Sequence, residues 1–301
     1  MNGVISVIHI AAPLLLVTLG GLISEYAGRM AMFLECMINL GAFCCYAFTQ
    51  WTGNLVAGIV LSVAACTLLV CAIERVAARR KANMFLVSLA MNMFFAALAT
   101  FLSATLFGTR GVLYSDTFRF DAATVRTGTT IVCAVLAAAQ IVMLRRTTFG
   151  LTLRVTGSDG DVLQSCGISP ARYRTISWLF AAANASLAGC VLAARLSSYV
   201  PGMAGGRGWT ALAAVYLGKK HPIFVALAVL VFSAAEYASV TAQNIAAFKN
   251  VPPSVLLALP YLVSLALIVA VPQKKRARER QQNIQTKNTI DRSLFILNKN
   301  L

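Results

Sequence analysis

The sequence predicts an all-α, polytopic helical membrane protein with about nine membrane segments, eight of them long and one short or re-entrant. Of its 301 residues, 58% are hydrophobic and only 12% are charged, which is more apolar surface than a soluble domain of this length could bury. The apolar residues recur in long runs along the chain and leave no room for a separate globular unit. We therefore expect residues 1–272 to form one transmembrane domain.

Crossing a hydrocarbon core of about 30 Å takes roughly 20 helical residues, and eight apolar runs are long enough. They are residues 4–23, 30–50, 55–73, 84–107, 126–144, 174–196, 222–242 and 254–272. A ninth run, residues 208–218, is short and follows a glycine-rich stretch. It could be a thin span, half of a broken helix or a re-entrant segment that lines a cavity.

The basic residues predict the orientation in the membrane. Although the net charge is +16, the Lys and Arg residues fall in short clusters between apolar runs, where anionic lipid and the positive-inside effect explain them better than nucleic acid does. Nine crossings with the N-terminus outside put all but six of the 26 on the inner side; the exceptions are Arg110, Arg119, Arg126, Arg195, Arg207 and Lys249. The C-terminus is then cytoplasmic, and the basic polar tail, residues 273–301, is expected to be disordered or to lie on the inner leaflet.

The inner loop formed by residues 145–174 is unusually long for a chain whose other connections are short. Its middle predicts a short amphipathic helix with an N-cap, an acidic first turn, an apolar face and a glycine stop, formed by Ser158, Asp159, Asp161, Val162, Leu163 and Gly167. Such a helix could dock into a groove on a soluble motor. A solvated connector with a capped turn explains the periodicity equally well.

This loop resembles the cytoplasmic coupling segment of the ABC permeases that import simple sugars, nucleosides and branched-chain amino acids. In GLTLRVTGSDGDVLQSCGISPARYR, the residues that match the family pattern are Gly150, Leu153, Arg154, Gly157, Gly167 and Ile168. The Gly-Glu-Asn-Pro usual in the family is replaced by Gly157, Ser158, Asp159 and Gly160.

A second and more specific resemblance lies in PGMAGGRGWTALAAVYLGKKHP, which is similar to a segment of the nucleoside and simple-sugar branch. Its glycine-rich turn, formed by Gly205, Gly206, Arg207, Gly208 and Trp209, is a candidate gate or receptor contact. Arg207 could cap a half-helix or touch the binding protein, or it could equally be a solvated loop charge. VPPSVLLALPYLVSLALIVAV resembles the last span of that branch, and residues 12–43 resemble the first two helices of the smaller permease of nucleoside systems.

The resemblance covers about residues 11–272 and implies a permease subunit that is not an enzyme and needs no cofactor. It would form half of the translocation pathway for nucleosides or simple sugars, together with a second permease subunit, commonly a larger paralogue. A cytoplasmic ATP-binding subunit and an extracytoplasmic substrate-binding lipoprotein would complete the importer. The coupling to the ATPase would fall on Gly150, Arg154, Gly157, Ser158, Asp159, Gly160, Asp161, Val162, Leu163, Gly167 and Ile168.

Polar residues inside the apolar runs are candidates for the lining of the pathway, because they are costly in lipid and usually face a partner or a wet cavity. They are Glu35 with Asn39 one turn on, Ser88 with Asn92 one turn on, and Glu236. Each could instead be a hydrogen-bonded packing group, an interpretation that is slightly favoured for Glu35 and Glu236 and more clearly favoured for Ser88 and Asn92. Packing is also predicted for Asn184, which sits beside a row of small residues, Ala181, Ala185 and Gly189, that favours close helix approach. No metal site is expected, because His9 and His221 are far apart without a carboxylate or cysteine pattern.

Two other classes of function stay open at this point. An ion-coupled secondary transporter of small polar solutes would need paired ionisable residues at mid-membrane and inverted repeats. A membrane-embedded enzyme would need a nucleophile, a base or a metal cluster on facing helices. The sequence shows neither pattern clearly.

Overall fold

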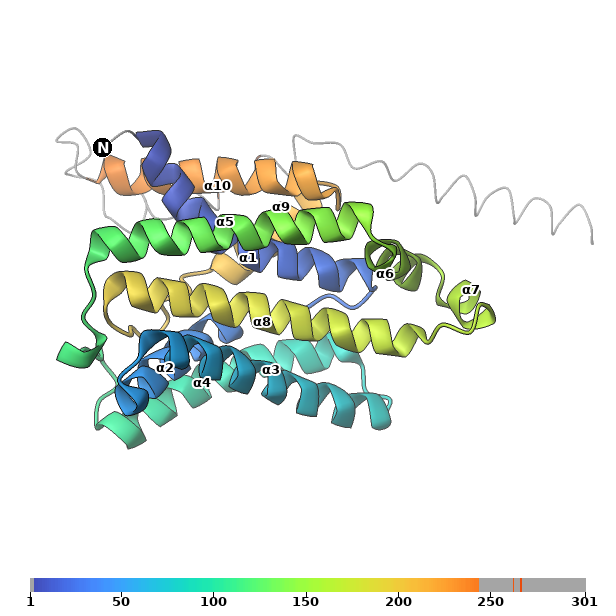
Figure 1. Cartoon of the computed structure of the whole chain (residues 1–301). Helices are drawn as coiled ribbons and strands as arrows, with labels where there is room; N and C mark the ends of the chain where they lie inside the picture. The colour runs from blue at the N-terminus through green and yellow to red at the C-terminus, as the bar shows by residue number, and fades with distance from the viewer. Residues whose placement is uncertain (1–2, 244–261, 263–265, 267–301) are drawn as a thin grey trace, which may run out of the picture. The chain divides into compact units, whose positions relative to one another are not determined.

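The computed structural model describes residues 3–243 together with residues 262 and 266 (Figure 1). The predicted span 254–272, apart from those two positions, and the tail 273–301 lie outside the described residues. The chain divides into two units, residues 1–264 and 265–301, and the description below concerns the first. Its described part is helical, with one short 3-10 turn, η1 (Asp116–Phe118), and one antiparallel bridge between Leu113 and Tyr199.

Six helices of the described part are long and apolar enough to cross a membrane. They are α1 (Gly3–Tyr26), α3 (Leu55–Arg79), α4 (Met84–Phe107), α5 (Ala122–Arg146), α8 (Pro170–Leu196) and α10 (Pro222–Ala242). These six helices match six of the eight long runs that the sequence predicts. The chain is therefore a multi-pass helical membrane protein, although the predicted count of nine segments is not confirmed.

Two further helices differ from these six: one begins later than the predicted run, and the other is too short to cross the membrane. The predicted run 30–50 forms α2 (Leu34–Thr52), and residues 27–33 before it are a non-helical linker that contains Gly28, with φ +74°. The short run forms α9 (Arg207–Leu217), whose 11 residues extend about 16 Å, roughly half of a hydrocarbon core. Both helices start inside the unit rather than at its surface, since Leu34 and Gly208 are buried.

The centre of the unit is the contact between α2 and α8, where small residues let the two backbones touch. A Cβ atom on Gly41 would lie 2.5 Å from the Cα of Ser186, and one on Gly189 would overlap the carbonyl oxygen of Ile38. The predicted small-residue stripe on α8, Ala181, Ala185 and Gly189, is buried, and a Cβ atom on Gly20 of α1 would lie 3.1 Å from the Cα of Ala181. Close helix approach at this stripe is therefore confirmed.

The two ends of the helix bundle carry different connections (Figure 1). At one end, α6 (Thr148–Ser158) and α7 (Gly160–Ser165) link α5 to α8. At the other end, residues 108–121 and the segment after α8 are joined by two backbone hydrogen bonds of 2.9 Å between Leu113 and Tyr199. The outer faces of α3, α4, α5 and α10 expose large apolar side chains, as helices in contact with lipid do.

Candidate functional site

The first part of the candidate site is the place where the N-termini of α2 and α9 meet. Glu35 lies in the first turn of α2, and its two carboxylate oxygens accept hydrogen bonds of 2.7 Å from the backbone N–H groups of Gly206 and Gly208. These donors belong to the start of α9, where the orphan N–H groups of a helix and its dipole favour a negative charge. One carboxylate therefore holds the starts of two short helices together.

The glycine-rich turn before α9 fits this arrangement closely. Gly206 is the N-cap of α9 and has φ +82°, a conformation that favours glycine. A Cβ atom on Gly208 would lie 2.5 Å from the backbone nitrogen of Glu35, so only glycine allows this approach. Asn39, one turn after Glu35, accepts a hydrogen bond of 3.0 Å from the backbone N–H of Ala204. The predicted pair Glu35 and Asn39 thus binds the turn 204–208.

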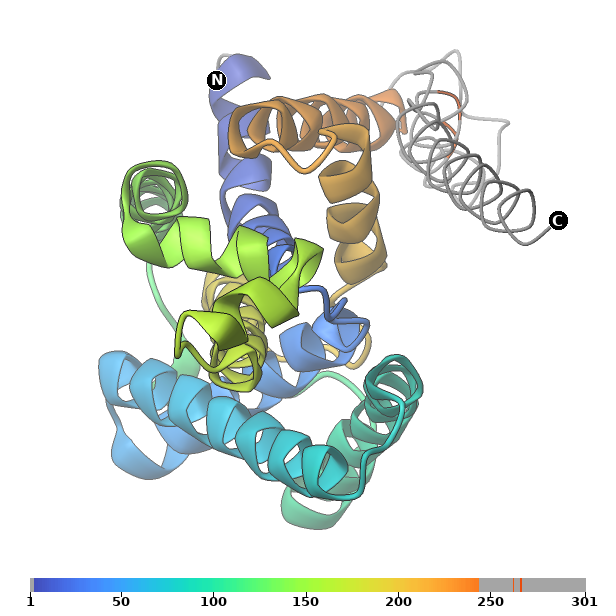
Figure 2. The same ribbon diagram turned by 90° about the vertical axis from the view of Figure 1, so that its right-hand side faces the viewer.

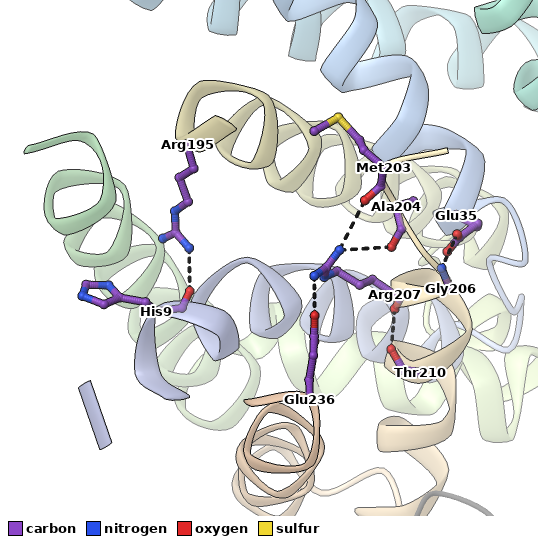
Figure 3. Close-up of polar contacts among 9 residues, drawn as sticks. All are labelled: His9, Glu35, Arg195, Met203, Ala204, Gly206, Arg207, Thr210 and Glu236. Carbon is purple, nitrogen blue, oxygen red and sulfur yellow. Dashed lines mark hydrogen bonds and ion pairs between the residues drawn. The ribbon is translucent and has the colours of Figure 1, made fainter. Parts of the chain in front are cut away.

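Arg207 projects from the same turn and forms an ion pair with Glu236 of α10 (Figure 3). Its guanidinium group also donates to the carbonyl oxygens of Met203 and Ala204. About a quarter of each side chain in the pair is accessible, while the Arg207 Nε and the hydroxyl of Ser233 have no protein hydrogen-bond partner in the described structure. Arg207 and Glu236, predicted separately, are therefore brought together. Trp209, two residues after Arg207, is 42% exposed.

The other predicted pair, Ser88 and Asn92, lies on α4 and caps the start of α2. The Ser88 hydroxyl accepts hydrogen bonds from the backbone N–H groups of Met32 and Phe33, and the Asn92 side chain accepts one of 2.9 Å from Cys36. The side chain of Ser88 is fully buried. These contacts agree with the packing interpretation, because both residues satisfy backbone groups that lipid could not.

The second part of the candidate site is the segment of residues 145–174, which the sequence predicts to contact an ATPase, and here the structure corrects two details. Asp159, and not Ser158, caps α7: its carboxylate accepts from the backbone N–H groups of Asp161 and Val162 at 3.2 and 3.4 Å. Ser158 instead ends α6, a helix that the sequence analysis did not predict, and its hydroxyl donates to the carbonyl of Val155. Because α6 continues through Ser158, the next residue, Asp159, is the one left in the N-cap position of α7.

The predicted stop at Gly167 is confirmed by the hydrogen bonds that end α7. Gly167 has φ +75°, its N–H donates to Gln164, and the N–H of Ile168 donates to Leu163, the pattern of a Schellman motif. The apolar face is split: Leu163 is buried, whereas Val162 is 51% exposed. A pocket of about 400 Å³ lies beside α7, lined by Gly160, Asp161, Gln164, Gly167, Ile168, Ser169, Pro170, Ala171 and Arg174.

The residues of α6 that match the family pattern fix this helix against α5 and α1. A Cβ atom on Gly150 would overlap the carbonyl of Leu144, and one on Gly157 would overlap the carbonyl of Tyr26. Arg154 donates a hydrogen bond of 2.7 Å to that same Leu144 carbonyl, and its guanidinium carbon lies 5.1 Å from the centre of the Tyr26 ring. Gly150, Arg154 and Gly157 therefore anchor the segment to the membrane helices.

A buried ion pair that the sequence analysis missed connects the linker 27–33 to α3 and α8. Arg29 and Glu74 lie 2.7 Å apart, and the carboxylate of Glu74 is only 2% exposed. Glu74 also accepts a hydrogen bond of 2.9 Å from Thr175, and the indole of Trp178 donates to the carbonyl of Arg29. The signal available in the sequence was Glu74, an acidic residue directly before the basic cluster Arg75, Arg79, Arg80 and Lys81, together with the isolated basic residue Arg29.

Two other polar groups were not predicted as parts of a site. Near the start of α1, Arg195 of α8 donates a hydrogen bond to the carbonyl of His9 (Figure 3). It also donates to the hydroxyls of Thr129 and Thr130 on α5. On the same two helices, Gln140 and Asn184 form a reciprocal pair of amide hydrogen bonds of 2.7 and 3.3 Å. Both groups join α5 to α8, which agrees with the packing role predicted for Asn184.

Comparisons with known proteins agree with this architecture. Three relatives are each matched over 85–88% of both chains: the guanosine ABC transporter permease NupQ of Bacillus subtilis at 25% identity, a putative glucose ABC transporter permease, TsgC13, of Haloferax volcanii at 25%, and the nucleoside ABC transporter permease NupC of Lactococcus lactis at 23%. The solved structure of PsaBC from Streptococcus pneumoniae has the same fold, with a TM-score of 0.56 at 13% identity over 93% of this chain and 96% of that one.

The family model described as the permease component of branched-chain amino acid transport systems matches residues 3–272. That range includes both parts of the candidate site, residues 145–174 and the meeting point of α2 and α9. The chain therefore belongs to this permease family.

Proposed function

We propose that this ABC importer permease forms half of a translocation pathway for nucleosides and is driven through residues 145–174 by a cytoplasmic ATPase. The permease assignment follows from the family and from relatives that are named as ABC transporter permeases. The substrate, the role of the coupling segment and the orientation in the membrane are the parts proposed here.

The observation that carries the coupling proposal is the contact of α6 and α8 with the linker 27–33. From one side, Gly157 of α6 packs on Gly28, so that a Cβ atom on Gly28 would lie 3.1 Å from the Gly157 Cα. From the other side, Trp178 of α8 donates to the Arg29 carbonyl and meets the Phe33 ring edge to face, with centroids 5.1 Å apart. A force on α7 would therefore reach the linker through α6 and α8, the two helices that flank α7 in the chain.

The far end of this linker is the start of α2, which carries Glu35. Because Glu35 also caps α9, a displacement of the linker would act on the turn 204–208 and on the ion pair of Arg207 with Glu236. Alternating access requires a pathway element with two arrangements. We propose that α9, held at its start by a few polar contacts, is that element, and that Glu35, Asn39, Arg207 and Glu236 line the pathway beside it.

The orientation follows from the same proposal. The end of the bundle that holds α6 and α7 would face the cytoplasm, and the N-terminus would lie outside. The partners would be a second permease subunit, which we propose to be a larger paralogue, the ATP-binding subunit, and a substrate-binding lipoprotein at the outer end. Nucleosides are preferred over simple sugars because two of the relatives are named for guanosine or nucleoside transport and one for glucose.

Coupling can be tested by placing a charge on the exposed face of α7. In proteoliposomes that contain the complete transporter, we expect Val162→Arg to reduce ATP-driven uptake at least tenfold, because a charged side chain would disrupt an apolar contact with the ATPase worth about 1.5–3 kcal/mol. The matched control is Val162→Leu, which keeps an apolar side chain at the same position, where the native side chain is 51% exposed. Equal uptake by the two variants would show that α7 is only a connector.

Substrate class can be tested in cells that lack their own copy of this permease. Expression of the chain with its operon partners should restore uptake of labelled guanosine, and unlabelled uridine should compete better than ribose or glucose. Preferential competition by glucose would move the assignment to sugars. Uptake that persists when ATP is depleted but an ion gradient is kept would instead support a secondary transporter.

A further inference from the structure

A basic pocket lies at the end of the bundle that holds α6, away from the meeting point of α2 and α9. Its volume is about 420 Å³, within the range of small-ligand sites, and its lining is Tyr26, Arg145, Arg154, Lys219, Lys220 and His221. These residues come from the end of α1, the end of α5, the middle of α6 and the connection between α9 and α10. Figure 2 shows this end of the bundle, with α1 between α5 and α10.

The charges in the pocket are only partly neutralised. Glu25 pairs with Lys220 at 2.6 Å. Arg145, Arg154 and Lys219 have no carboxylate partner in the part of the chain that the structure describes. A solvated basic loop would spread such charges apart, whereas here four segments bring them together around one cavity. The pocket therefore suits a ligand with one or two negative charges.

The backbone of the pocket is held in an unfavourable conformation. Lys219 and Lys220 both have left-handed φ angles, 50° and 57°, a conformation that is unfavourable for residues with a Cβ atom. The Tyr26 hydroxyl donates to the Lys220 carbonyl, and the N–H of Lys220 donates to Val215. These contacts hold the backbone of Lys220 in this turn, and both lysines line the pocket.

Apolar surface adjoins the pocket along the two helices that flank it. Phe224, in the first turn of α10, is 56% exposed, and its ring lies 5.0 Å from that of His221. Val142, one turn before the end of α5, is 57% exposed. Cationic groups beside exposed apolar side chains at a helix end are suited to an amphiphile. We propose that this pocket binds the phosphate-bearing headgroup of an anionic membrane phospholipid, whose chains lie along α5 and α10.

The test compares two double variants that remove the same charge at the same end of the bundle. Arg145→Gln with Lys219→Gln alters the pocket. Arg146→Gln with Lys81→Gln is the matched control, because Arg146 adjoins Arg145 in the last turn of α5 and Lys81 has a left-handed φ of 51°, yet neither lines the pocket. The full chain, purified and delipidated in detergent, is titrated with short-chain phosphatidylglycerol and analysed by native mass spectrometry.

We expect phosphatidylglycerol to bind the pocket variant about 10- to 30-fold more weakly than the wild type, and the control variant less than about threefold more weakly. Arg145→Gln alone should give about a fivefold loss, which keeps the test valid if the double variant folds poorly. Equal losses in both double variants, or equal binding of phosphatidylcholine to the wild type, would overturn the site. Inorganic phosphate that binds the pocket as tightly as the lipid would show that the occupant is a soluble anion, and would overturn the lipid assignment.

Discussion

At the scale of single residues, side chains that sequence analysis selects as polar groups in an apolar setting are mostly caps for helix ends. Glu35 holds the start of α9, and Ser88 and Asn92 hold the start of α2. Each broken helix exposes N–H groups inside a protein where lipid cannot satisfy them. These residues are polar because they satisfy the N–H groups that a broken helix leaves unpaired in the membrane. Any role in the pathway would be additional to this capping role.

Glu35→Gln should weaken the junction of α2 and α9. The amide keeps one acceptor oxygen but loses the charge and turns an NH₂ group toward a backbone donor, which we expect to cost about 1–3 kcal/mol. Glu35→Ala should cost more, because both N–H groups then lose their partner. The measurement is the apparent Tm of the purified chain in detergent. Asp116→Asn, at an exposed carboxylate of the loop 108–121, is the control, and a Tm for Glu35→Ala equal to that of this control would contradict the capping role.

At the scale of secondary-structure elements, glycine positions separate helices that pack backbone to backbone from helices with free surface. Gly41 and Gly189 lie where α2 and α8 touch, whereas a Cβ atom on Gly128 of α5 would meet nothing within 4 Å. A glycine is thus required for close packing in α8, whereas in α5 the glycine at position 128 makes no packing contact that a larger residue would disturb. Sequence analysis recognises the stripe that ends at Gly189, but only the packing shows which glycines are needed.

Gly189→Ala should destabilise the protein, while Gly128→Ala should stabilise it slightly. The first substitution forces α2 and α8 apart and is expected to cost about 1–3 kcal/mol. The second replaces an exposed helical glycine and should gain roughly 0.5–1 kcal/mol. Apparent Tm values of the two variants, measured side by side, check this. If both changes have the same sign, the close approach of the two helices is wrong.

The linker 27–33 is the second element whose role depends on packing. Glu74→Ala leaves Arg29 without its partner in a largely buried site. We expect the free energy of unfolding to fall by about 3 kcal/mol, which is the lower end of the range for a broken buried ion pair, because the Arg29 side chain is 18% exposed. The variant that also carries Arg29→Ala should lose less than the sum of the two single losses, by about 1–3 kcal/mol. Thermal unfolding of the four proteins forms the double-mutant cycle. Strict additivity would show that the pair contributes nothing.

At the scale of the whole molecule, the sequence predicts the membrane helices well and their interruptions poorly. The runs 84–107 and 222–242 coincide with α4 and α10, because length and hydropathy alone decide a span. The run 30–50 is predicted as continuous, yet α2 begins at Leu34, since the break depends on Gly28 and on hydrogen bonds from α4. The helix α6 is missed because TFGLTLRVTGS is rich in Thr and Gly and becomes helical by packing on α1 and α5.

The proposed orientation can be tested with a cysteine that the chain already has. Of its eight cysteines, Cys166, at the end of α7, is the only one that is exposed; the other seven are buried or half-buried. A membrane-impermeant maleimide should therefore label inside-out vesicles and leave right-side-out vesicles unlabelled. Cys166→Ser should abolish the signal. Labelling of right-side-out vesicles would place α7 on the outer surface and would overturn the proposed coupling.

The bridge between Leu113 and Tyr199 ties the loop 108–121 to the chain that leads into α9. Only a few residues separate Tyr199 from the turn that Glu35 and Asn39 bind. In the proposed orientation, a substrate-binding protein that lands on this outer loop would pull on the entry to α9, just as the ATPase would push on it through the linker. Binding of a loaded receptor and closure of the ATPase would then both act on the start of α9, so that either event alone would change the free energy that the other must supply to move this helix.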